Sequence, residues 1–230
     1  MKWDPFEIEQ LRPILQQVQA DLEPLEGKHI LVLCSAAGEV AFWLGERMKN
    51  GHVTGLELDP ALLEGSQCAA KNRGLEDVVE FLQVEKTRIP LPDGTFDGLV
   101  SEFIAFPTPA PAEIGQPEMA RVLKPGGKMA LTDVIVTRPV PPAIRSDLQA
   151  IGLDYLCDAT PDDFRSWMTA AGLGNIKTLD FTPVVKQVWK QRRESDQLLE
   201  HQKGYADLFD DPEFRLGTAI FYIYVCGVKA

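Results

Sequence analysis

The feature that most constrains the fold is a regular alternation of short apolar segments with helical ones, beginning at HILVLCSAAGEVAFWLG, His29 to Gly45. Buried strands are expected at 29–34, 52–57, 78–84, 98–103, 128–136 and 176–181, and in the terminal stretch TAIFYIYVCGVKA. Strands separated by helices of this length form βαβ units. The pattern therefore predicts an α/β protein with a mainly parallel sheet and helices on both faces.

Local signals mark the ends of the expected helices. Asp59 and Pro60 supply an N-cap and a first-turn proline for a helix that stops near Gly74. A second helix is expected to start at Thr160-Pro-Asp-Asp and to end at Gly172, a glycine suited to a helix C-terminus. Further helices are expected at 39–48, at 118–123 before the turn Lys124-Pro-Gly-Gly, and within 184–199.

The length of 230 residues suits one α/β domain with elaborations. We expect a single domain over 1–230, with an N-terminal helix in 1–28 and an insertion at 184–218 before the last strand. The helical part of this insertion has an apolar stripe of Val185, Val188 and Trp189. It either packs over one end of the sheet or is a solvated surface helix, and the sequence leaves both readings open.

Composition narrows the class of partner. The formal net charge of −11 argues against nucleic acid or an anionic membrane as the main partner. No apolar run approaches the ~18 residues of a membrane span, and the start MKWDPFEIEQ has no secretory pattern. Four cysteines without CxxC spacing and three scattered histidines predict free thiols, no zinc site and a cytoplasmic location.

The carboxyl ends of the strands are the expected ligand site, because parallel sheets bind ligands where the strand order reverses. Glu57 ends the second expected strand, and a carboxylate there can accept both hydroxyls of a ribose. Its alternative role is a surface glutamate beside a helix N-terminus. Glu85 follows the third strand, where an adenine would lie, and Ser101 lies in the fourth, beside the reacting end of such a cofactor.

Four stretches carry a family resemblance: HILVLCSAAGEVA, VTGLELDP, VEFLQVEKTRIPLPDGTFDGLVS and EMARVLKPGGKMALTDV. Together, over roughly residues 25–180, they resemble the class I S-adenosylmethionine-dependent methyltransferases, in the branch of the ubiquinone/menaquinone-biosynthesis and arsenite enzymes. The resemblance implies a Rossmann-like seven-stranded, mostly parallel sheet with an antiparallel last strand. It also implies S-adenosylmethionine as the cofactor, with S-adenosylhomocysteine as product, and a small-molecule methyl acceptor.

The resemblance assigns cofactor contacts by position. It implies a ribose acid at Glu57, an adenine-flanking residue at Leu58 and an adenine-amino acceptor at Glu85, followed by Lys86. Ser101 falls beside the methionine moiety. The glycine-rich loop falls on Cys34, Ser35, Ala36, Ala37 and Gly38.

This chain departs from the family pattern in that loop. Cys34 and Ala36 replace two of three glycines, and Val32 replaces the usual acid of the first strand. Because the replacements are small, we expect the loop amides still to reach the cofactor, with Cys34 as an apolar filler. Tyr155 stands where we align one of the arsenic-binding cysteines, so arsenite is not the expected substrate.

No residue of the sequence is assigned a catalytic role. In-line methyl transfer depends mainly on placing a nucleophile behind the methyl group, and no histidine is placed as a base. Candidate substrate-facing residues are Glu102, Phe103, Phe106, Asp154 and Tyr155. Two other functions stay open: a non-catalytic binding protein with this fold, suggested by the altered loop, and a nicotinamide-dependent oxidoreductase.

Overall fold

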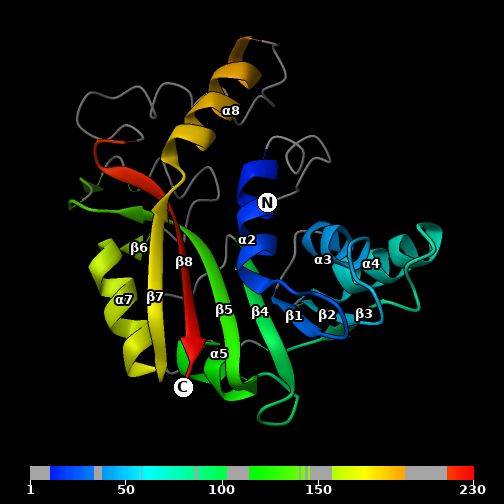
Figure 1. Ribbon diagram of the computed structural model, residues 1–230. Coiled ribbons are helices and arrows are strands. Elements are labelled where there is room, and N and C mark those ends of the chain that lie inside the picture. The colour runs from blue at the N-terminus through cyan, green and yellow to red at the C-terminus, as the bar shows by residue number, and fades with distance from the viewer. Residues whose placement is uncertain are drawn as a thin grey trace.

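The computed structural model describes residues 11–33, 38–57, 59–85, 88–102, 114–139, 141–142, 145, 157–194 and 217–230. The strands are β1 (His29–Leu33), β2 (His52–Glu57), β3 (Val79–Gln83), β4 (Phe96–Glu102), β5 (Leu123–Val136), β6 (Cys157–Asp158), β7 (Leu173–Asp180) and β8 (Ile220–Lys229). The helices are α2 (Arg12–Leu22), α3 (Glu39–Gly45), α4 (Pro60–Asn72), α5 (Gln116–Val122), α7 (Pro161–Ala170) and α8 (Thr182–Glu194). Figure 1 shows one sheet with helices on both sides of it.

The sheet has the strand order β3-β2-β1-β4-β5-β8-β7, and the short β6 pairs with the end of β5. β8 runs antiparallel to both of its neighbours, β5 and β7, while the other pairings are parallel. The expected Rossmann-like sheet of seven main strands with an antiparallel last strand is confirmed. The chain leaves β1 in one direction to β2 and β3 and crosses to the other side for β4, so strand order reverses at β1.

Several boundaries differ from the sequence prediction. The N-terminal helix ends at Leu22, well before residue 28, and Glu23-Pro24 follows it directly. β5 begins at Leu123 instead of 128: Phe96 pairs with Leu123 and Gly98 with Lys128, so the KPGG segment bulges within the strand. The two-residue β6 is too short to give a periodic pattern and was not expected.

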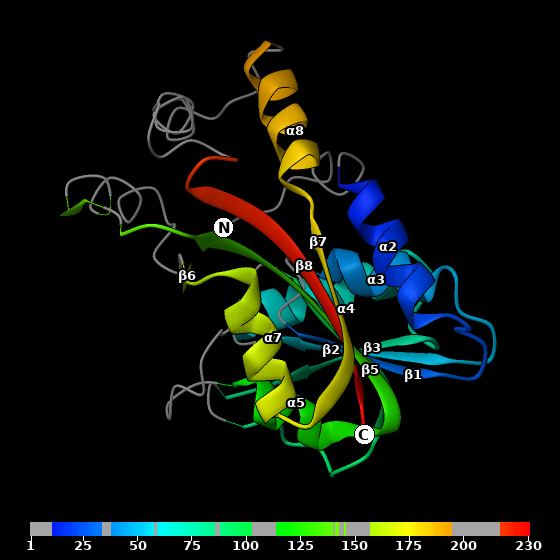
Figure 2. The ribbon, with the colours of Figure 1, turned by 60° about the vertical axis from the view of Figure 1, so that its left-hand side comes forward.

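The two faces of the sheet have separate apolar cores, and Figure 2 shows the helices that lie on either side of the sheet. One core joins β1, β4 and β5 to α5 and α7 through residues such as Leu99, Met119 and Phe164. The other joins the same strands to α2, α3 and α4 through Val18, Phe42 and Ala70. Both faces are covered because neither face of a parallel sheet is left to solvent.

The helix α8 starts directly after β7 and therefore stands at the carboxyl edge of the sheet, projecting beyond it in Figure 1. Val185 and Val188 pack against a small cluster of Leu11, Ile14 and Tyr222. The first turns of α8 thus pack on this edge through their apolar stripe, which both readings of the 184–218 insertion include, and the choice between the two readings stays a prediction. No helix among the described residues has the length and apolar character needed to cross a membrane.

The two most specific motifs of the family resemblance contact each other. Arg121, from RVLKPGG, donates to the backbone oxygens of Ile89 and Leu91, at 2.9 and 3.0 Å, and pairs with Asp93 of LPDGTFD. Lys124 pairs with Asp97 at 2.9 Å. These motifs join the start of β4 to the start of β5, at the edge opposite the strand carboxyl ends. They fix the scaffold and do not line the expected site.

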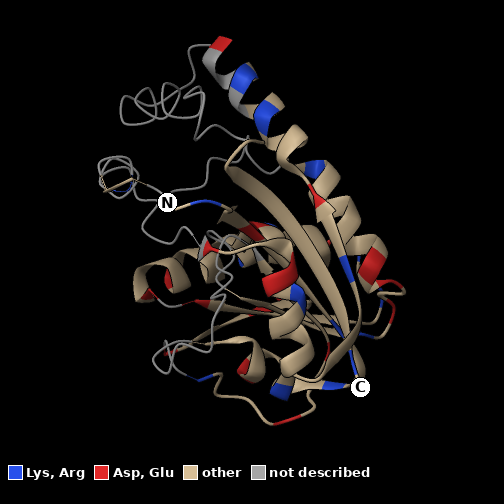
Figure 3. Cartoon of the chain, turned by 90° about the vertical axis from the view of Figure 1, so that its left-hand side faces the viewer, with Lys and Arg blue, Asp and Glu red and all other residues tan. Residues whose placement is uncertain are grey.

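Charged residues of both signs are spread over the helices and connections in Figure 3. Some tie elements together: Asp21 of α2 accepts hydrogen bonds from Lys177 Nζ of β7 at 2.6 Å and from the Tyr224 hydroxyl of β8 at 2.7 Å. Burial raises the pKa of Asp21, but these donors outweigh it and the net pKa lies below its usual value. The carboxylate thus anchors α2 on the sheet.

Candidate active site

The carboxyl ends of β1, β2 and β4 lie side by side. Leu33, the last residue of β1, pairs with Leu56 of β2 on one side and with Ser101 of β4 on the other. Glu57 comes one residue later on β2, paired with Gln83 of β3. Neighbouring strands are about 4.8 Å apart. The sheet therefore brings Glu57 and Ser101 to opposite sides of the β1 end, as the sequence predicts.

Glu57 is a buried carboxylate, 3% exposed, at the end of β2. Its hydrogen-bond donor among the described residues is the Ser66 hydroxyl of α4, at 3.3 Å. Burial raises the pKa of Glu57; the Ser66 hydrogen bond opposes this shift, and the nearby Asp59 adds to it. A buried carboxylate held by one long hydrogen bond has acceptor capacity left for a ligand.

Gly38 begins α3 in the left-handed conformation, with φ of +84°. A Cβ there would lie 2.7 Å from Phe81 and 2.9 Å from Phe42, whose rings pack edge to face at 5.5 Å. The next residue, Glu39, pairs with Arg73. The one glycine kept from the family loop thus sets the direction in which α3 leaves the β1 end.

Replacing Gly38 by alanine is expected to lower the free energy of unfolding by about 2–4 kcal/mol, because it adds both a strained φ and a steric clash. Gly65→Ala is the matched control: Gly65 lies within α4 and a Cβ there meets nothing within 4 Å. That change should instead stabilise the helix by roughly 0.5–1 kcal/mol. Urea unfolding of both variants measures the difference; equal stability for the two would contradict this role of Gly38.

The other predicted cofactor contacts differ in burial, and several lie outside the described part of the chain. Ser101 is fully buried in β4, on the same face as Leu99. Glu85 is exposed and forms an isolated antiparallel bridge with Arg88, so the chain turns back just beyond β3. Glu102 closes β4. The remaining predicted residues lie outside the described part of the chain: Cys34, Ser35, Ala36, Leu58, Lys86, Phe103, Phe106, Asp154 and Tyr155.

Two buried polar residues were not singled out from the sequence. Asp133 lies near the end of β5, and its Oδ2 has no hydrogen-bond partner in the described structure; its Oδ1 accepts only from the Val134 amide, at 2.7 Å. Desolvation by burial raises its pKa well above the usual value. Gln116, the first residue of α5, has neither side-chain amide atom paired within the described residues.

Asp133 and Gln116 belong to one side of the sheet. Alternation along β5 places Asp133 on the face of Leu131 and Ile135, and these two share a core with Met119 of α5. A charged residue inside the apolar run KMALTDVIV was the available sequence signal. Buried polar atoms without partners are uncommon in native proteins, and a functional site is one of the recognised reasons for them.

The residues of the edge fit an adenosine-containing cofactor. A ribose offers two adjacent hydroxyl donors, and Glu57 offers a buried carboxylate that has one hydrogen-bond donor among the described residues. Hydrogen bonds from a diol to that carboxylate would favour its ionised form and offset its burial. The arrangement around β1, a left-handed glycine followed by a helix, is the one that brings backbone amides to such a ligand.

Residues 30–127 match the family described as a methyltransferase domain. Demethylmenaquinone methyltransferase from Thermus thermophilus is 36% identical over 115 residues, which cover 50% of this chain and 49% of that protein. Arsenite methyltransferase from Halobacterium salinarum is 28% identical over 153 residues, covering 66% of this chain and 38% of that protein. The chain thus spans half or less of the length of these two relatives.

A solved geranyl diphosphate methyltransferase in complex with SAM shares the fold. It superimposes with a TM-score of 0.77 over 98% of this chain and 87% of that one, at 16% identity. The antiparallel last strand of the sheet is what the sequence resemblance implies. Residues 30–127 are thus similar in sequence to the methyltransferase domain family, and the chain shares the fold of this solved methyltransferase.

Proposed function

We propose that this protein transfers a methyl group from S-adenosylmethionine to a small-molecule acceptor. The observation that carries the proposal is the buried Glu57 carboxylate, with spare acceptor capacity, beside the strand-order reversal at β1. A ribose diol fits that acceptor better than a phosphate would, because a phosphate is repelled by the same charge.

The proposed cofactor contacts follow the edge of the sheet. Glu57 accepts the ribose hydroxyls, and Leu58, Glu85 and Lys86 border the adenine. Ser101, together with the loop residues Cys34, Ser35, Ala36 and Gly38, borders the methionine end. The support for Glu57 and Ser101 is their position near the carboxyl ends of β2 and β4, on either side of β1, and the support for Gly38 is its place at the start of α3. For the other residues the support is the family pattern alone.

The protein's contribution to methyl transfer is mainly positional. The sulfonium supplies an activated methyl group, and the chain must hold a nucleophile in line with it and exclude water. We propose that Asp133 hydrogen-bonds the acceptor, because it lies near the carboxyl end of β5 and its Oδ2 has no hydrogen-bond partner among the described residues. Above its raised pKa, the Asp133 carboxylate can also take a proton from a hydroxyl or ammonium acceptor.

We further propose a single methyltransferase domain over residues 1–230 that works in the cytoplasm and binds no nucleic acid. Support comes from the formal net charge of −11 and from the free thiols of Cys68 and Cys226, which suit a reducing compartment. The start of α8 at the carboxyl edge supports a role for the 184–218 segment on the acceptor side.

A thermal-shift panel tests the cofactor class. S-adenosylmethionine and S-adenosylhomocysteine should raise Tm, whereas NAD and NADP should not, since only a ligand bound to the native state shifts unfolding. A shift with NAD or NADP alone would point to the oxidoreductase. Binding of both sulfur compounds with no S-adenosylhomocysteine formed on a panel of phenol, quinol, amine and carboxylate acceptors would point to the non-catalytic binding protein.

A further inference from the structure

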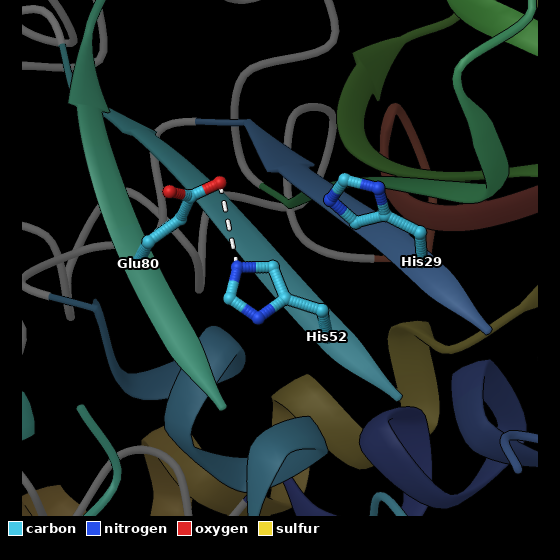
Figure 4. A group of neighbouring side chains, drawn as sticks. All are labelled: His29, His52 and Glu80. Atoms are coloured by element: carbon cyan, nitrogen blue, oxygen red, sulfur yellow. Dashed lines mark ion pairs between the residues drawn. The ribbon is translucent and has the colours of Figure 1, made fainter. Parts of the chain in front are cut away.

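Three potential metal ligands meet on a part of the sheet that the proposed function does not use. His29, His52 and Glu80 come from β1, β2 and β3, and Figure 4 shows their side chains grouped on one face of the strands. One ligand atom from each lies within 4.8 Å of the others. The sequence separation of the two histidines hides this contact, which is why a metal site was not expected from spacing alone.

Strand register produces the cluster. His29 and His52 are paired residues of adjacent parallel strands, and Glu80 pairs with Thr54. Side chains two residues apart on a strand share a face, so His52 and Thr54 point the same way. The register of the three strands therefore fixes the ligand positions, and a metal needs no rearrangement of the backbone to meet them.

From this geometry we propose that His29, His52 and Glu80 form a binding site for a divalent transition metal of the zinc, cobalt or nickel type. Two imidazoles and one carboxylate are the ligand types that these ions prefer over magnesium or calcium, which take oxygen ligands. A three-ligand protein site leaves further positions to water.

The existing distances are close to what a metal needs. His52 Nε2 and Glu80 Oε1 are 3.4 Å apart, and a tetrahedral zinc site has ligand atoms about 3.3–3.5 Å apart. His29 is the more rigid ligand: its backbone amide donates to Asp97 and its ring packs on Phe96, with ring centroids 4.4 Å apart. His52 and Glu80 are 34% and 46% exposed, so their side chains can rotate toward the metal at low cost.

Thr54 is not itself a metal ligand but contacts two of the proposed ligands, His29 and Glu80. Its hydroxyl donates to Glu80 at 2.8 Å and lies 2.8 Å from His29 Nε2. Without a metal, the single hydroxyl proton goes to the carboxylate and Thr54 accepts from His29 Nε2, which links His29 and Glu80. A metal bound by that nitrogen would take the place of its proton, and the Thr54 hydrogen bond would still orient the Glu80 carboxylate.

The site is separate from the cofactor edge. His29 and His52 are the first residues of β1 and β2, whereas Glu57 is the last residue of β2. Five residue steps at about 3.3 Å put these ends of β2 some 16 Å apart. A metal here joins three strands and is expected to stabilise the sheet without entering methyl transfer, so this proposal does not depend on the proposed function.

Cobalt and zinc titrations of the full chain test the site. Co²⁺ should bind with one equivalent per chain and give visible d–d bands without a thiolate-to-metal charge-transfer band, since the ligands are nitrogen and oxygen. Zn²⁺ should displace it and raise Tm by several degrees. His52→Gln and Glu80→Gln, at partly exposed positions that keep the fold, should each weaken Zn²⁺ binding roughly tenfold or more.

Two controls match these variants. His201→Gln removes the third histidine of the chain, and Cys68→Ser removes an exposed thiol; both should bind Zn²⁺ with unchanged affinity. Retention of full affinity in His52→Gln and Glu80→Gln would overturn the proposal. So would thiolate bands with Co²⁺, loss of binding in either control, or no saturable binding below millimolar metal.

Discussion

Replacing Glu57 by alanine is expected to weaken S-adenosylmethionine binding by about 10- to 100-fold, because hydrogen bonds to a charged group are each worth roughly 1.5–3 kcal/mol. Glu57 is buried and its donor within the described chain is Ser66 alone, so little in the protein replaces a ribose diol. Isothermal titration calorimetry measures the loss. Glu64→Ala, on the exposed side of α4, is the control and should bind with unchanged affinity.

The pH dependence of binding separates a direct contact from a structural effect. The pKa of Glu57 is raised in the protein, and hydrogen bonds from a diol would lower it in the complex. Binding then expels a proton, so affinity is highest above the pKa of free Glu57 and falls as pH drops through it. Glu57→Gln cannot titrate and should show a flat profile. A wild-type profile with no such fall would contradict the ribose contact.

Asp133→Asn is expected to make the protein more stable at neutral pH while lowering its turnover. Burial raises the pKa of Asp133, so the folded chain holds its proton at pH values where the unfolded chain has lost it. The folded state is therefore penalised as pH rises from about 4 through the raised pKa, by about 1.4 kcal/mol for each pKa unit. Asparagine keeps the shape and the Val134 contact without this penalty.

The turnover of Asp133→Asn distinguishes a carboxyl that contacts the acceptor from one that is buried without a role in catalysis. If Asp133 contacts the acceptor, kcat should fall by roughly ten- to a hundredfold with the affinity for S-adenosylmethionine unchanged. Urea unfolding at several pH values and an S-adenosylhomocysteine-release assay measure the two effects. The gain in stability should vanish below about pH 4, where both states are protonated. Unchanged kcat would remove Asp133 from the acceptor site.

The parts of the fold that sequence could predict are those with strong local signals. The strand HVTGLE was bounded correctly at His52 and Glu57, because β-branched and apolar residues fill it and Gly51 precedes it. Asp59 caps α4 by accepting from the Ala61 amide, and Thr160 and Asp163 form a capping box. Glu57 was correctly placed as the last residue of its strand, and its contact with a ribose stays a prediction.

The parts that could not be predicted depend on strand register. The bulge of KPGG within β5 arises because Phe96 pairs with Leu123, a contact between residues 27 positions apart. The pairing of His29 with His52 could not be predicted either, because it depends on the register between two strands and not on a local sequence pattern. Asp133 was quoted within a motif but not interpreted, because only burial and its unpaired oxygen distinguish it from a surface aspartate.

Binding of S-adenosylmethionine at the Glu57 edge of the sheet is tested by calorimetric titration of the wild-type chain with S-adenosylmethionine and S-adenosylhomocysteine. We expect saturable binding of both at one site per chain, strongly weakened in Glu57→Ala and unchanged in Glu64→Ala. Absence of binding at millimolar ligand, or equal binding by wild type and Glu57→Ala, would contradict a cofactor site at Glu57.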